Sequence, residues 1–175
     1  MRKHLSYILI LALLLSLLGC SFGNDGILEP VTFYYTRDMQ DPETFITDSQ
    51  DGFFVSEIRE ASGHTGDLYY LLSLYLQGPL DDDLHSPFPS GCRILTVYQK
   101  ENAVHVQLSE AFSSLQNLEL TVASACIART CMELTGMQEV HITAYSSESS
   151  PIDILIRQDS LLLTDEFPYE TIPKE

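Results

Sequence analysis

Three consecutive aspartates, Asp81, Asp82 and Asp83, form the densest group of potential metal ligands in the chain. Calcium is a hard cation that prefers several carboxylate oxygens close together, so the triplet suggests a calcium loop. However, the triplet lacks the alternating ligand positions and the distant bidentate glutamate of an EF-hand loop. A solvated acidic turn, available for contact with another protein, is the favoured interpretation. We therefore predict no metal site and no cofactor.

The histidines are spaced too widely to predict a catalytic site. His64, His85, His105 and His141 are far apart in the sequence, and no serine lies in a G-x-S-x-G turn. A hydrolase needs a nucleophile, a base and an orienting acid in register, and no local pattern supplies them. His105 and His141 fall on the polar sides of predicted strands, where solvent contact is expected. We predict that the protein is not an enzyme.

Three of the four cysteines, Cys92, Cys126 and Cys131, lie well inside the chain. No C-x-x-C motif and no Cys/His spacing typical of zinc occurs. Cys126 and Cys131 share an apolar helical stripe with Ile127 and Leu134, so they are predicted to be small buried residues. A disulfide from Cys92 to one of them is the alternative for an exported protein.

The first twenty residues predict an exported, lipid-anchored protein. Residues 2–4 are basic, and Leu5 to Leu18 is an apolar run that is short for a transmembrane helix and typical of a signal peptide. The sequence Leu17-Leu18-Gly19-Cys20 resembles the lipobox of bacterial lipoproteins. There the cysteine thiol receives diacylglycerol, and acyl chains such as palmitate hold the protein on the extracytoplasmic face of the cell membrane. An ordinary secretory signal and an uncleaved anchor are the alternatives.

The charge is strongly acidic, with 25 acidic against 9 basic residues and a formal net charge of −16. Removal of a leader that carries Arg2 and Lys3 would leave a formal charge of about −18. Nucleic acid and anionic lipid headgroups are poor partners for such a surface. Cation-rich surroundings or a basic protein partner are more compatible with it.

One amphipathic helix dominates the middle of the chain. Asp67 is a good N-cap, and Leu68, Leu71, Leu72, Tyr75 and Leu76 fall on one helical face. Gly78 and Pro79 end the helix, because glycine accepts a left-handed cap conformation and proline cannot continue the hydrogen-bond ladder. Tyr69 and Tyr70 flank the stripe. Exposed tyrosines favour interfaces, but a position at the edge of the core is the favoured interpretation.

The remaining periodicity predicts an α+β fold in β-β-α-β-β-α-β order, a mixed sheet with two helices packed on one face. The expected strands are 31–36, 53–60, 93–98, 103–108 and 140–144, and the second expected helix is 118–134. We predict a signal peptide at 1–19, a lipid-anchored tether at 20–30, a domain at 31–163 and an acidic tail at 164–175. Two apolar runs suggest an extra hairpin at 152–163.

Several segments, in order and spacing, resemble the GerMN domain of envelope lipoproteins in spore-forming bacteria. They are Leu71-Leu72 ahead of Gln77-Gly78-Pro79, Pro89-Ser90-Gly91, Val106-Gln107-Leu108-Ser109 before Phe112, and Ile127 with Thr130. The resemblance covers residues 31–145. It departs at Cys92, where the family often has threonine, and at Ser146 to Ser150, which replace an acidic, glycine-containing ending.

The resemblance implies a role in sporulation, germination or cell-envelope assembly through protein–protein contact at a membrane surface. The family's fold is similar to ring-building modules of a secretion-like channel, which implies a possible homo-oligomer. It offers no catalytic residues to carry over. A lipoprotein that binds a ligand or wall fragment is the alternative function, and a wall-active hydrolase is the third.

Overall fold

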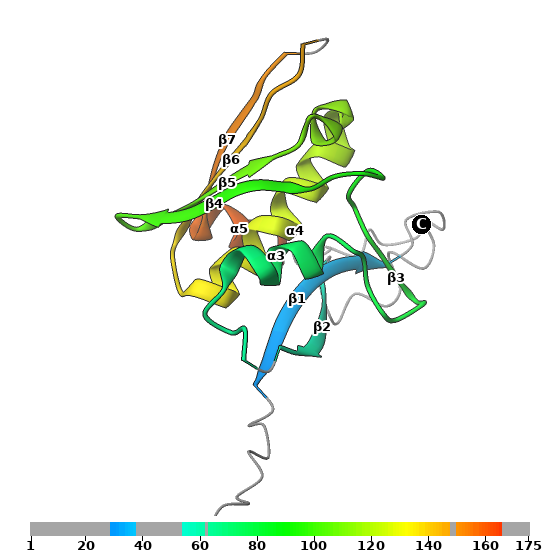
Figure 1. The fold of residues 1–175 in the computed structure, drawn as a ribbon. Coiled ribbons are helices and arrows are strands. Elements are labelled where there is room, and N and C mark those ends of the chain that lie inside the picture. The colour runs from blue at the N-terminus through cyan, green and yellow to red at the C-terminus, as the bar shows by residue number, and fades with distance from the viewer. Residues whose placement is uncertain (1–28, 38–53, 62, 148–149, 166–175) are drawn as a thin grey trace, which may run out of the picture.

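The computed structural model describes residues 29–37, 54–61, 63–147 and 150–165 (Figure 1). The predicted signal peptide, Cys20, most of the tether and residues 166–175 lie outside these ranges. The elements are β1 (Pro30–Arg37), β2 (Val55–Glu60), α3 (Leu68–Tyr75), β3 (Leu84–His85), β4 (Ile94–Lys100), β5 (Ala103–Leu108), the 3-10 helix η2 (Glu110–Ser114), α4 (Asn117–Thr135), β6 (Glu139–Ala144), β7 (Ile152–Arg157) and α5 (Gln158–Asp165). The predicted α+β class is confirmed.

The strands form two sheets, whereas the sequence suggested one. One sheet has the order β2-β1-β3 and is antiparallel, and the other has the order β4-β5-β6-β7 with a parallel β5–β6 pair. The reason for the division lies at the edge of β1 that faces away from β2. There Thr130 Oγ1 accepts from the Tyr34 N–H at 3.0 Å, and the Tyr75 hydroxyl donates to the Tyr34 carbonyl at 2.6 Å. At Tyr34, side chains from two helices thus take the place of a neighbouring strand, and β3 pairs with this edge only at Thr36 and Arg37.

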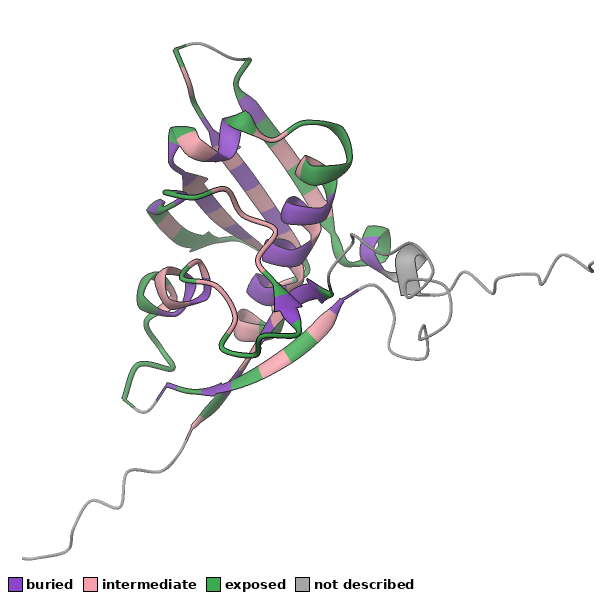
Figure 2. Ribbon diagram, turned by 90° about the vertical axis from the view of Figure 1, so that its right-hand side faces the viewer, coloured by how far each residue is buried: buried purple, intermediate pink, exposed green. Residues whose placement is uncertain are grey.

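Helix α4 fills the space between the two sheets instead of covering one face of a single sheet. It contacts β1 on one side and β5, β6 and β7 on the other (Figure 1). Small residues make this possible: Ala123, Ser124, Cys126, Ala128 and Cys131 are all buried. A helix that is buried on most of its circumference needs neither a wide polar face nor long side chains. Figure 2 shows this burial along α4 and the alternation of buried and more exposed residues along the strands.

The local signals at the helix ends are confirmed. The Asp67 side chain accepts from the Tyr70 N–H at 3.0 Å, as expected of an N-cap. Gly136 takes a left-handed conformation with φ 70° at the end of α4, and its N–H donates to the Met132 carbonyl. The predicted stripe on α3 buries Leu71, Leu72 and Tyr75.

A buried arginine connects β2 to the end of α3. Arg59 is only 6% exposed. Its guanidinium donates to the Tyr35 hydroxyl at 3.1 Å, to the carbonyls of Leu74 and Gly78, and to the Glu57 carboxylate. The ion pair and the carbonyl contacts satisfy the donors of a charge that would otherwise be costly to bury.

Two expected segments differ in the structure. The hairpin expected at 152–163 is wrong: residues 152–157 form β7, which pairs with β6, and helix α5 follows. β7 pairs antiparallel with the preceding strand β6 and not with the residues that follow it. The second apolar run, which starts at Leu161, therefore belongs to α5, where Leu161 is buried. Residues 109–117, for which no helix or strand was expected, contain the 3-10 helix η2, which buries Phe112.

We predict that Arg59→Met destabilises the protein by about 3–5 kcal/mol, because removing one partner leaves the Glu57 carboxylate buried without its cation. The Glu57 side chain is only 10% exposed. The matched control is Arg157→Met, which breaks the exposed pair with Glu139 and should cost about 0–1 kcal/mol. Urea denaturation of both variants measures the difference. Equal losses would contradict a special role for Arg59.

Candidate interaction surface

The predicted interaction residues do not form one cluster. Tyr69 and Tyr70 lie in the first turn of α3, whereas Asp81 to Asp83 follow its far end. Both tyrosines are exposed, at 51% for Tyr69 and 40% for Tyr70, so the core-edge interpretation understated their accessibility. Tyr70 stacks on His64 with ring centroids 4.1 Å apart, and Tyr69 is directed toward β4. Successive helical positions differ by about 100°, which separates the two rings.

The aspartates are exposed and belong to a hydrogen-bonded turn. The Asp81 carboxylate accepts from the Asp83 N–H at 3.0 Å. The Glu57 carboxylate accepts from the N–H groups of Leu80 and Asp81, at 2.7 and 2.9 Å. Among the described residues no three His, Cys, Asp or Glu side chains are grouped closely enough to hold a metal ion. The turn presents acidic side chains to solvent at the end of the helix that Arg59 and Glu57 hold in place.

A shallow groove of about 410 Å³ lies between the start of α3 and β4. We call it the tyrosine groove; it is lined by Gly66, Asp67, Leu68, Tyr69, Val97, Tyr98 and Gln99. The Tyr69 hydroxyl donates to the Ile94 carbonyl of β4 at 3.5 Å. Tyr98, which also lines the groove, is 53% exposed. Sequence reasoning missed Tyr98, although its position on the polar side of a strand, beside Val97, was a usable signal.

The tyrosine groove continues onto the solvent-facing side of the four-stranded sheet. Tyr98 stacks flat on His105, with centroids 4.7 Å apart and an interplanar angle of 3°. His105 in turn contacts His141 on the next strand. Both histidines were expected to contact solvent; they are half-buried, because they pack against each other and against Tyr98.

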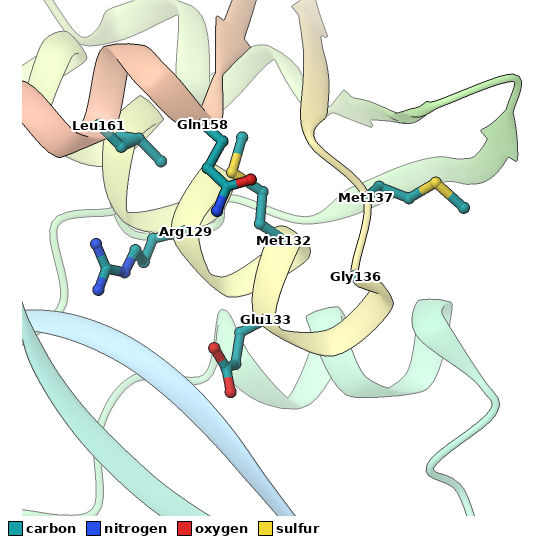
Figure 3. A pocket seen from close by; sticks show the side chains of 7 residues that line it. All are labelled: Arg129, Met132, Glu133, Gly136, Met137, Gln158 and Leu161. Carbon is teal, nitrogen blue, oxygen red and sulfur yellow. The ribbon is translucent and has the colours of Figure 1, made fainter.

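A second cavity, of about 220 Å³, lies between α4 and α5 (Figure 3). Figure 3 shows Arg129 and Glu133 of α4 and Leu161 of α5 around it. The Arg129 guanidinium lies 4.9 Å from the centre of the Tyr34 ring, and the Tyr34 hydroxyl donates to Glu133 at 3.5 Å. Pockets for small-molecule ligands usually measure about 300–1,000 Å³, so this cavity is small for that purpose.

The cysteines described by the structure are free thiols inside the core. Cys92 is 8% exposed, and Cys126 and Cys131 are fully buried. The prediction of small buried residues is confirmed, and none of these three cysteines forms the alternative disulfide. Burial raises the pKa of the Cys92 thiol to about 11 and that of Cys126 to about 12. These thiols are therefore protonated and unreactive at neutral pH.

The described part of the chain contains no helix that is both long and apolar enough to cross a membrane.

The family model Germane, described as sporulation and spore germination, matches residues 32–147. No curated protein matches the chain.

Solved structures of two proteins are among those similar to the chain. The tandem GerMN domains of the sporulation protein GerM from Bacillus subtilis align with a TM-score of 0.50 and 14% identity, over 72% of this chain and 44% of that one. The chain therefore spans less than half of that tandem structure, and the likeness concerns the fold alone. A Clostridium perfringens protein named as a candidate lipoprotein aligns with a TM-score of 0.45 and 16% identity, over 75% of this chain and 89% of that one.

Raising the pH should lower the free energy of unfolding, since the Cys92 thiol has an ordinary pKa of 9.0 and a pKa of about 11 in the fold. A group whose pKa is raised by folding stabilises fully below its unfolded pKa, and this contribution is lost as the pH rises through the folded pKa. Between pH 9 and 11, we expect the free energy of unfolding to fall less steeply with pH for Cys92→Ala than for the parent, as measured by urea unfolding under reducing conditions. The loss of the thiol volume lowers the free energy of unfolding equally at both pH values and leaves this slope unchanged. A slope equal to that of the parent would therefore contradict the raised pKa of Cys92.

Proposed function

Because the chain belongs to the Germane family of sporulation and spore germination, we propose that it is a membrane-tethered, non-enzymatic module for protein–protein contact. Its setting is sporulation, germination or cell-envelope assembly. The resemblance to GerMN domains predicted for residues 31–145 is confirmed by the family match and by the fold of the tandem domains. The proposal extends that family relationship to a mode of action.

The tyrosine groove is the observation that carries the proposal. Tyr69 and Tyr98, each about half exposed, both line one shallow depression. Tyrosine buries a large area on binding and loses little side-chain entropy, because it has only two side-chain torsions. Residues of this type near the centre of an interface carry much of its binding energy.

The acidic surface defines the kind of partner. The chain has a formal net charge of −16, and three of its carboxylates, those of Asp81 to Asp83, are exposed together beyond the end of α3. Opposite charge increases the rate of encounter and suppresses contact with acidic surfaces. The partner is therefore an envelope protein with a basic or neutral contact surface, and the affinity falls as salt screens the charges.

The leader supports attachment to the membrane. Residues 5–18 are apolar, and Cys20 follows Leu17-Leu18-Gly19 as a lipidated cysteine would. Acyl chains on Cys20 would hold the domain on the extracytoplasmic face through a tether that ends at Pro30, where β1 begins.

Binding of a ligand or wall fragment is the second candidate function, and the cavity between α4 and α5 is the feature in its favour. Arg129, Glu133 and Gln158 contribute polar groups there, beside the thioethers of Met132 and Met137. Its volume of about 220 Å³ would hold only a small part of a wall fragment. Contact between proteins is therefore the better supported function.

Replacing both groove tyrosines, Tyr69→Ser with Tyr98→Ser, should weaken partner binding at least tenfold, because two aromatic contacts of more than about 1 kcal/mol each are lost. The control is Tyr70→Ser, which removes an exposed tyrosine outside the groove. The lipidated chain and its variants are crosslinked in intact cells, and captured envelope proteins are quantified by mass spectrometry. Equal capture by the double variant would refute the groove as the contact surface. Failure of the parent chain to capture any envelope protein would refute the function itself.

Cys20→Ser should abolish incorporation of a palmitate analogue, since no other thiol stands at the lipobox. Cys92→Ser, which alters a buried core thiol, should retain the label. Metabolic labelling followed by membrane fractionation tests both variants. A labelled Cys20→Ser chain would show that the anchor lies elsewhere.

A further inference from the structure

We propose that His105 and His141 form a two-histidine site for a divalent transition-metal cation, with zinc as the reference ion. The two residues are 36 positions apart in the sequence and become direct neighbours through strand pairing. β5 and β6 run parallel, and His105 lies opposite His141 in their register. Both side chains project from the face opposite to α4, because the alternating residues Val104, Val106, Val140 and Ile142 fill the core.

The separation of the two imidazoles matches a shared metal ion. The Nδ1 atoms of His105 and His141 are 3.3 Å apart. Two nitrogens that bind one tetrahedral zinc at about 2.0–2.1 Å are separated by about 3.3 Å. Without a metal, one of the two facing nitrogens has to carry a proton and donate it to the other. A cation at about 2.0–2.1 Å from both nitrogens would displace that proton and lie to one side of the line between them, and both rings would turn so that their lone pairs meet at the ion.

A carboxylate behind His141 favours the tautomer that a ligand requires. The Nε2 atom of His141 is hydrogen-bonded to Asp153 Oδ1 on β7, and the ionised carboxylate can only accept. The proton of neutral His141 is therefore on Nε2, and the lone pair on Nδ1 is directed at His105. Carboxylates that hold a histidine in this way are a regular feature of metal sites and increase the basicity of the ligand.

The first ligand is also held in place, and the site is accessible. Tyr98 stacks on the His105 ring with centroids 4.7 Å apart, which limits the rotation of that ring. The side chains of His141 and Asp153 are 32% and 67% exposed, so a cation can reach the pair from solvent. The described residues offer these two ligands and no grouped third one. Water or a donor from another molecule would complete the coordination, as open metal sites allow.

The three buried thiols and His64 lie apart from the pair. The thiols of Cys92, Cys126 and Cys131 are buried. His64 lies near the start of α3, where its ring stacks on Tyr70. It therefore provides a matched control, since it is a partly stacked surface histidine outside the sheet.

The test is calorimetric titration of the full-length chain, purified in detergent without a polyhistidine tag, with zinc chloride in a buffer that does not bind metals. We expect one zinc per chain, and at least tenfold weaker binding in His105→Gln and in His141→Gln. Asp153→Asn should weaken binding by about 10–100-fold, because it removes the orienting carboxylate but no ligand. His64→Gln should bind as the parent does.

Thermal unfolding with EDTA and with excess zinc provides the second measurement. EDTA scans show whether each variant still folds, and zinc should raise the Tm of the parent and of His64→Gln equally, and that of His105→Gln, His141→Gln and Asp153→Asn less. The proposal is overturned if zinc does not bind the parent, or if a folded His105→Gln or His141→Gln binds it with parental affinity. In either case the two histidines form only a hydrogen-bonded pair.

Discussion

The Arg59 guanidinium and the side chains of Tyr35 and Tyr75 join β1, β2 and α3 to one another. Tyr35 donates to the carbonyl of Tyr75 at 2.9 Å, and the Tyr75 hydroxyl donates to the backbone of the neighbouring Tyr34 at 2.6 Å. The two rings are also in contact, with centroids 4.9 Å apart. This reciprocal pairing joins β1 to α3, and Arg59 adds β2 through the Tyr35 hydroxyl and the carbonyls at the end of α3. Because each polar group is buried and paired, displacement of any one segment would leave the others unsatisfied.

Helix α4 packs against β1 on one side and against the four-stranded sheet on the other, and so connects the two sheets. Thr130 of α4 accepts the Tyr34 N–H, so the helix is joined to β1 by a hydrogen bond as well as by packing. Its small buried residues bring β1 close on one side, and β5, β6 and β7 on the other. The faces of the four-stranded sheet thereby differ: one is covered by α4, and the other carries Tyr98, His105 and His141 toward solvent. The surface proposed for binding is a consequence of which face α4 covers.

The tyrosine groove and the histidine pair share Tyr98, which lines the first and stacks on the second. A protein bound in the groove would therefore lie beside the proposed cation site. Arg59 and Glu57 act at the opposite end of α3, where they hold its last carbonyls and the N–H groups of the acidic turn. Helix α3 therefore has an exposed tyrosine, Tyr69, at its start, and the exposed carboxylates of Asp81 to Asp83 follow its end.

The sequence by itself determined the features that depend on near neighbours. The N-cap Asp67, the apolar stripe from Leu68 to Leu76, the alternation along β5 and the helix end at Gly136 were all predictable, since capping and periodicity are local properties. The candidate tyrosines Tyr69 and Tyr70 were also visible, but not the fact that only Tyr69 lines a groove. Tertiary structure alone decided which face of β2 is buried: Arg59 is inside at 6% exposure, and Ile58 is outside at 71%, against the usual order of hydrophobicity. The partners that make this favourable come from β1 and the end of α3. The division into two sheets and the meeting of His105 with His141 likewise rest on contacts between distant segments, which no local pattern encodes.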